Sequence, residues 1–261
     1  MSEIHPCITL EISGQVAVIS LNSPSTLNAL SLEMVRGLSQ AIKHVKADSR
    51  LRVLLIKGEG RAFCAGGDLR YFSGASTDEI RTLITLMHEA IDTLSRLPIP
   101  VIACVHGTLA GAGVSLALAC DFVVAAEATT FNFAYTRVGT SPDASATWHL
   151  PRQVGLHRSL AMLMLSEAMG AEEAMQLGIV YAIHSAETLS AACVALTGRL
   201  VDAPSFALAQ TKKLIRDASH RSLPEQLSAE LDSFCACAQT HDFDEGIDAF
   251  FNKRSPAFTG A

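Results

Sequence analysis

Apolar and polar positions follow two different periods along the first two-thirds of the chain. Residues 8–13 and 16–21 are short runs rich in β-branched side chains on either side of Gly14, which predicts two strands joined by a turn. Residues 31–47 instead repeat their apolar positions at helical spacing behind Ser31, a residue type that caps helices. The apolar positions of this predicted helix are Leu32, Val35, Leu38, Ile42 and Val45. The sequence therefore begins with two strands and an amphipathic helix.

The alternation of strand-like and helix-like segments continues to about residue 185. Further strands are predicted at 52–57, from 101, at 122–126, at 131–135 and at 180–183. Helices are predicted from 76 to about 97, at 114–120, in short pieces between 144 and 178, and from 187 onward. This order predicts an α/β core followed by helices alone. We expect the core and its ligand site in residues 1–195 and a helical region in residues 196–261.

Composition narrows the classes of partner. With 261 residues, 49% hydrophobic and 18% charged, the chain can bury a large core, and its net charge of -6 argues against nucleic acid. No run approaches the about 20 apolar residues of a membrane helix, and the N-terminus does not resemble a signal peptide. The seven cysteines lack metal-ligand spacing, so we expect no metal. Scattered thiols in apolar runs favour a cytoplasmic protein.

Two glycine clusters each come directly after a predicted strand. The first lies in residues 58–69, and the second, in residues 106–121, leads into an apolar helix through Gly107, Gly111 and Gly113. Backbone N–H groups at a helix start lack intrahelical partners and lie at the positive end of the helix dipole. Such a turn can hold a phosphate, or an oxygen that becomes negative during a reaction. A tight turn between packed elements is the alternative for either cluster alone.

Four motifs, in order and over almost the whole chain, resemble the crotonase (enoyl-CoA hydratase/isomerase) superfamily. They are residues 63–69, 106–121, 178–180 and 249–258. The resemblance implies a spiral of ββα turns and a C-terminal helical region used in trimer contacts, hence a homotrimer or hexamer. It also implies an acyl-CoA thioester as substrate, with coenzyme A part of that substrate and no separate cofactor. The thioester oxygen would lie between the amides of Gly67 and Ala112, and each such donor typically lowers a barrier by about 3–4 kcal/mol.

The chain departs from the hydratases of this superfamily at the two glutamates that add water. Ser115 and Tyr135 stand at the matching positions, so a two-glutamate hydration mechanism does not carry over. Asp143 falls where some isomerases of the superfamily place their carboxylate, and the fit is closest to the isomerases of bacterial phenylacetate degradation. We expect Asp143 to be the single acid/base that converts a 3-enoyl-CoA to a 2-enoyl-CoA. The alternative is that Asp143 caps the helix that follows it.

The surroundings of Asp143 should raise its pKa. We expect burial among Val138, Trp148 and Leu150, which disfavours the charged carboxylate. A raised pKa suits a group that takes up and returns a proton.

Further candidates follow from the same resemblance. The predicted substrate-binding residues are Ala65, Asp68, Leu69, Gly111, Ser115, Tyr135, Trp148, Phe250 and Lys253. Asp68 is expected to orient its loop, Trp148 to accommodate a bulky or ring-bearing acyl group, and Phe250 and Lys253 to reach coenzyme A from a neighbouring subunit. The alternative for Trp148 is an ordinary core residue, and the alternative for Lys253 is a solvated helix face. Hydration by a substituted site, and a catalytically silent CoA-thioester scaffold, remain the other functional interpretations.

Overall fold

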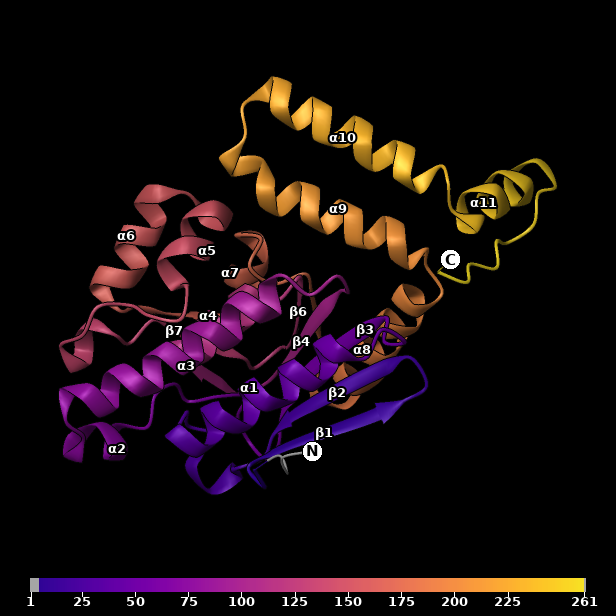
Figure 1. Ribbon diagram of the computed structural model, residues 1–261. Helices are drawn as coiled ribbons and strands as arrows, with labels where there is room; N and C mark the ends of the chain where they lie inside the picture. Colours follow the sequence, from indigo (N-terminus) through magenta and orange to yellow (C-terminus); the bar gives the residue numbers. More distant parts are fainter. Residues whose placement is uncertain (1–4, 261) are drawn as a thin grey trace.

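The computed structural model describes residues 5–260, which form one sheet of six strands and one of three (Figure 1). The large sheet contains, in spatial order, β1 (Ile8–Ser13), β2 (Val16–Leu21), β3 (Val53–Gly58), β4 (Val101–Val105), β6 (Phe122–Ala126) and β9 (Ala182–His184). Only β1 runs antiparallel to its neighbour; the remaining pairs are parallel. The small sheet contains β5 (Thr108–Ala110), β7 (Thr130–Asn132) and β8 (Ala168–Gly170).

Helices occupy most of the chain between and after these strands. They are α1 (Leu32–Ala47), α2 (Leu69–Gly74), α3 (Thr77–Ser95), α4 (Ala112–Ala119), α5 (Ala146–Val154), α6 (Leu156–Leu165), α7 (Ala171–Gln176), α8 (Ala186–Val201), α9 (Ser205–Asp217), α10 (Leu223–Cys237) and α11 (His241–Phe251). The expected cap of the first helix is present, since the Ser31 hydroxyl accepts from the Met34 amide at 3.3 Å. Ser76 and Glu79 form a reciprocal capping box at the start of α3.

Both faces of the large sheet are covered, which explains why its parallel strands are apolar throughout. In β3, Leu54 and Ile56 point to the main core, which they share with apolar side chains of α1, α3 and α4. Val53 and Leu55 point to the other face, where they share a second apolar cluster with α8. Figure 1 shows α1 and α3 crossing the sheet on one side, with α8 beside β3 and β4. The main core thus joins α1, α3 and α4 to one face of the sheet.

The differences from the expected elements lie in short segments. The strand expected at 131–135 is β7, which ends at Asn132, and the strand expected at 180–183 begins two residues later as β9. The helix expected at 114–120 begins two residues earlier, with the apolar α4. The short elements α2, β5 and β8 were not predicted, because three to six residues carry too little periodicity to identify them.

The C-terminal helices leave the sheet. The expected boundary between residues 195 and 196 falls inside α8, which packs on the sheet, and the chain turns away only after Val201. In Figure 1, α9 and α10 lie beside each other above the sheet, and α11 lies at the far end from α2 and α5. Among the described residues, no single helix is long and apolar enough to cross a membrane. One bent pair in this part of the chain, Ala186–Val201 with Ser205–His220 at 102°, is long and apolar enough when taken together.

Candidate active site

The first glycine turn is bound to the segment that precedes α1. The Leu30 amide donates to the Gly66 carbonyl at 2.7 Å, and the Ala65 amide donates to the Leu27 carbonyl at 2.9 Å. Gly66 has a φ of +88°, and a Cβ there would lie 2.5 Å from the Ala110 carbonyl oxygen. Only glycine therefore fits at this position, both for its conformation and for its contact with the second turn.

The second glycine turn packs backbone against backbone on the first. The Ala110 amide donates to the Cys64 carbonyl at 3.0 Å, and a Cβ on Gly113 would overlap that same carbonyl oxygen. Gly111 has a φ of +46°, and its amide donates to the Asn132 carbonyl at 2.9 Å. The helix α4 then begins at Ala112. The two turns are therefore direct neighbours in space.

The predicted donors Gly67 and Ala112 each lie in one of these turns. Within residues 5–260, neither amide donates a hydrogen bond to a protein acceptor. In contrast, the neighbouring amides of Ala65 and Gly111 are both bonded to carbonyls of the chain. Ala112 is also the first residue of α4, where the helix dipole favours negative charge. The turns thus present two amides that a ligand oxygen can accept from.

Asp143 lies in the segment between Val138 and α5, and it is half-buried. Its Oδ1 atom is fully buried and has no hydrogen-bond partner among the described residues. Burial is the largest effect on this carboxyl and raises its pKa above the ordinary value, against a smaller opposing effect of the Tyr135 hydroxyl. The site thus contains an aspartate that holds a proton more readily than an exposed one.

The helix-capping alternative for Asp143 is not what the structure shows. The helix that follows, α5, starts at Ala146 with Ser145 at its N-cap, and no side chain there makes a capping hydrogen bond. The expected burial of Asp143 is correct in direction, and the three residues expected around it differ in their own exposure. Val138 and Trp148 are 49% and 42% exposed, and only Leu150 is buried.

Ser115 and Tyr135 form a hydrogen-bonded pair next to Asp143. Their hydroxyl oxygens are 2.6 Å apart, and both hydroxyls also lie within hydrogen-bond distance of the Asp143 carbonyl, at 3.2 Å from Ser115 and 3.4 Å from Tyr135. The Tyr135 ring lies against Gly111, since a Cβ on that glycine would be 3.8 Å from it. Burial strongly raises the pKa of the Tyr135 hydroxyl, which is therefore neutral. The pair links the segment of Asp143 to the second glycine turn.

Asp68 and Leu69 begin the helix α2. The Asp68 carboxylate accepts from the amides of Arg70 at 2.9 Å and Tyr71 at 3.4 Å, so it caps α2 directly after Gly67. Leu69 is 56% exposed. Asp68 thus fixes the exit of the first glycine turn through backbone contacts.

Sequence reasoning missed two residues that shape this site. Asn28 is fully buried, and its amide nitrogen donates to the carbonyls of Glu59 and Ala62 at 2.9 Å each and of Phe63 at 3.2 Å. It therefore holds the segment that leads into the first glycine turn. His88, on α3, accepts from the Ala144 amide, one residue after Asp143. No motif in the sequence indicates either contact, because both join segments more than 30 residues apart.

Trp148 lies with Asp143 along a groove of about 1370 Å³ between α3, α5 and α9. The Arg152 guanidinium lies 3.4 Å from the centre of the Trp148 ring, and the His220 ring stacks on it at 5.2 Å. The structure therefore gives this indole cationic and aromatic neighbours from its own chain. Gly67 and Ala112 do not line this groove.

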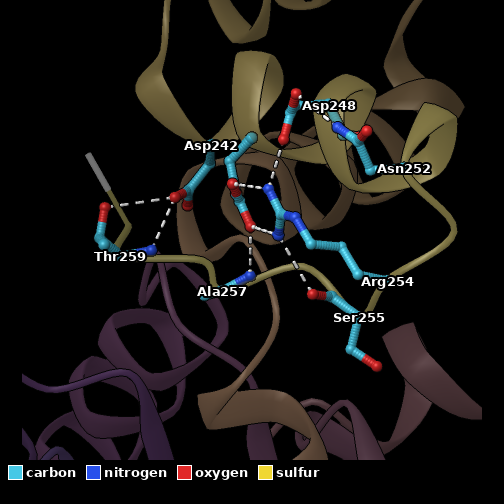
Figure 2. Close-up of polar contacts among 8 residues, drawn as sticks. Asp242, Asp248, Asn252, Arg254, Ser255, Ala257 and Thr259 are labelled. Atoms are coloured by element: carbon cyan, nitrogen blue, oxygen red, sulfur yellow. Dashed lines mark hydrogen bonds and ion pairs between the residues drawn. The ribbon is translucent and has the colours of Figure 1, made fainter.

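Phe250 and Lys253 lie at the end of α11, remote from α2 and α5 within one chain (Figure 1). Phe250 is 79% exposed. Figure 2 shows how the following tail is bound back to α11: Arg254 pairs with Glu245 and Asp248 at 2.6 Å each, and the Thr259 amide donates to Asp242 at 2.7 Å. A single chain therefore does not bring these two predicted residues to Asp143.

Comparisons with known proteins show the family of this chain. Residues 11–261 match the family model described as enoyl-CoA hydratase/isomerase. The chain belongs to the enoyl-CoA hydratase/isomerase family. Its architecture is the crotonase-type α/β fold with C-terminal helices that the sequence predicted.

Named relatives of this enoyl-CoA hydratase/isomerase family member include proteins called hydratases and proteins called isomerases. This chain is 39% identical to a "Probable enoyl-CoA hydratase" of Rhodobacter capsulatus and 36% identical to the 1,2-epoxyphenylacetyl-CoA isomerase of Escherichia coli. Each match covers 97% of this chain and 98% of the relative. A crystal structure of an enoyl-CoA hydratase from Polaromonas has a TM-score of 0.92 at 36% identity, over 97% of this chain and 99% of that one. The family is thus established, and the choice of reaction within it depends on the site.

Within residues 5–260, no group of three or more His, Cys, Asp or Glu side chains is arranged to hold a metal ion.

Proposed function

We propose that this family member is an enoyl-CoA isomerase that moves a double bond from the 3 to the 2 position of an acyl-CoA thioester. The observation that carries the proposal is Asp143, a half-buried carboxyl with a raised pKa and a buried oxygen that has no hydrogen-bond partner within residues 5–260. Ser115 and Tyr135, at the positions of the two hydratase glutamates, have hydroxyls that bond to each other and cannot act as carboxylate bases. One carboxylate is enough for a proton transfer between two carbons of one substrate.

The proposed reaction needs only groups of this chain and the substrate. The Asp143 carboxylate takes a proton from the α carbon, and the electron pair of that C–H bond moves toward the thioester carbonyl. The resulting negative oxygen accepts hydrogen bonds from the Gly67 and Ala112 amides, which have no protein acceptor in the described chain. Protonated Asp143 then returns the proton to the γ carbon, which leaves the double bond between the α and β carbons and regenerates the carboxylate.

The remaining substrate contacts belong to the same proposal. Ala65, Asp68, Leu69 and Gly111 would support the thioester between the two turns, and Trp148 would border the acyl group. Phe250 and Lys253 would contact coenzyme A of a neighbouring subunit, because within one chain they lie away from Asp143. Self-association as a homotrimer or hexamer is supported by exposed apolar side chains on one helix. These side chains of α10 are Leu223, Leu227, Leu231 and Phe234. A cytoplasmic location is consistent with the free thiols of all seven cysteines.

Hydration is the second candidate, because the relative from Rhodobacter capsulatus carries a hydratase name. One absorbance experiment separates the reactions. The purified protein is mixed with a 3-enoyl-CoA and, separately, with a 2-enoyl-CoA, and the ultraviolet absorbance of the conjugated thioester is followed. Growth from the first substrate supports the isomerase, whereas loss from the second supports a hydratase. No change with either, together with tight binding of coenzyme A thioesters, supports a silent scaffold.

The acyl group is tested with a second substrate. The Escherichia coli relative is named for 1,2-epoxyphenylacetyl-CoA, so ring-1,2-epoxyphenylacetyl-CoA should be compared with straight-chain 3-enoyl-CoA thioesters. A higher kcat/KM for the ring substrate would support a reaction of the same kind as that relative's. A higher value for the straight chains would support double-bond isomerisation in fatty acyl groups.

A further inference from the structure

His88 lies on the exposed side of α3, where it lines the groove that also contains Asp143. The Ala144 amide donates to its Nε2 atom at 3.2 Å, across 56 residues of sequence. Since Nε2 is the acceptor, this hydrogen bond assigns the proton of the neutral imidazole to Nδ1. A protonated imidazole has no acceptor and could not make this contact.

The hydrogen bond is made at a strained point of the backbone. Ala144 and Ser145 have φ values of +47° and +74°, a left-handed conformation that side chains disfavour. Ala144 is fully buried, so its amide needs a partner, and the start of α5 offers no side-chain cap. His88 is that partner. These two residues follow Asp143 directly, so their conformation helps to fix the position of the Asp143 backbone.

On the side facing Ser115 and Tyr135, hydrogen bonds reach only the main-chain carbonyl of Asp143. Ser115 and Tyr135 both contact the Asp143 main-chain oxygen, whereas the side-chain Oδ1 atom has no partner in the described chain. No hydrogen bond to Oδ1 within residues 5–260 fixes the direction of the Asp143 side chain, so its position depends in part on the backbone turn. This makes the contact at Ala144 the one that holds the turn from the side of α3.

We propose that His88 is a positioning residue for Asp143: as a neutral acceptor it holds the Ala144–Ser145 turn and so aims the carboxylate at the reacting carbon. The role rests on the proposed isomerase function. It needs the acceptor atom of the imidazole, not its bulk. Glutamine places a carbonyl oxygen near the position of Nε2, so His88→Gln should keep this role. Leucine has similar bulk but no acceptor, so His88→Leu should lose it.

The test compares His88→Leu and His88→Gln with the wild type in the isomerase assay. We expect His88→Leu to lower kcat on the order of 100-fold, the effect of misplacing a reacting group by about 1 Å, with KM unchanged. His88→Gln should recover most of the lost kcat. His44→Leu is the matched control, because His44 lies on α1 and its side-chain hydrogen bond within residues 5–260 is to the Gln40 carbonyl of its own helix, at 2.8 Å. An unchanged kcat in His88→Leu, or equal losses in both His88 variants, would overturn the proposal.

Hydrogen exchange gives a readout that does not depend on activity. The Ala144 amide should exchange slowly in the wild type, in His88→Gln and in His44→Leu, and much faster in His88→Leu. Equal exchange in all four proteins would overturn the role of His88. Should the wild type fail to isomerise enoyl-CoA thioesters while this exchange pattern holds, the proposed reaction fails, and the contact between His88 and the turn stands.

Discussion

Replacing Asp143 by asparagine should change activity and stability in opposite directions. Asparagine has nearly the same shape but cannot take up the proton, so the isomerase rate should fall about 10³- to 10⁴-fold, within or near the usual range for general acid–base catalysis. That loss corresponds to about 4–5.5 kcal/mol of activation free energy. We expect the upper part of the range because the neighbouring hydroxyls of Ser115 and Tyr135 are occupied with each other and cannot replace a carboxylate.

The expected gain in stability follows from the pKa of Asp143. Burial raises this pKa in the folded state above its ordinary value of 3.8. Between the unfolded and folded pKa values, the folded protein binds more protons, so its stability decreases as the pH rises through this window. At neutral pH the full penalty of a half-buried carboxylate is present, and Asp143→Asn removes it. The variant should therefore have a higher Tm than the wild type at pH 7, and this difference should vanish below pH about 4.

The same shift sets the pH dependence of the wild-type reaction. The carboxylate form starts the reaction, so kcat should decrease as the pH falls through the raised pKa of Asp143. Asp92→Asn is the matched control, because Asp92 lies in the same groove but is 62% exposed and paired with Arg96. It should leave the rate and Tm nearly unchanged. A rate for Asp143→Asn above a tenth of the wild type, or a lower Tm at pH 7, would refute the reasoning.

Two further substitutions test contacts around the site. Tyr135→Phe removes a hydroxyl that is bonded to Ser115 and adjacent to Asp143, and it should cost about 1–2 kcal/mol of unfolding free energy. Because this hydroxyl lowers the pKa of Asp143, its loss should move the acid limb of the pH–rate profile to higher pH. An unmoved limb would contradict the contact. Asn28→Ala leaves buried carbonyls without a donor and should destabilise by about 2–4 kcal/mol in denaturant unfolding; a loss under 1 kcal/mol, roughly that of a surface substitution, would show that Asn28 does not hold the first turn.

The long elements and the glycine turns were predictable from local signals. Helix α1 follows from its apolar spacing and its Ser31 cap, and both are present in the structure. The two turns were recognisable because Gly66 and Gly113 approach other backbone so closely that no side chain fits, which leaves glycine clusters in the sequence. These signals lie in short continuous stretches of the chain, so they can be identified from the sequence alone.

The contacts between distant segments were not predictable in the same way. His88 looks like an ordinary polar position on the outer face of α3, and only the folded chain brings it to Ala144. Trp148 was expected to bury Asp143, yet it lies 42% exposed beside Arg152, because no local pattern tells which side of a short helix faces solvent. Phe250 matched a family motif, but a motif does not say which subunit's site a residue serves.

The proton transfer itself offers the most direct test of the proposed reaction. A 3-enoyl-CoA carrying deuterium at the α carbon is converted in ordinary water, and the product is examined by mass spectrometry and NMR. Because the Oδ1 atom of Asp143 is fully buried, its proton should be partly shielded from exchange with solvent. We predict deuterium at the γ carbon of part of the 2-enoyl product. Product with solvent hydrogen alone at that carbon in every molecule would contradict the direct return of the same proton by Asp143.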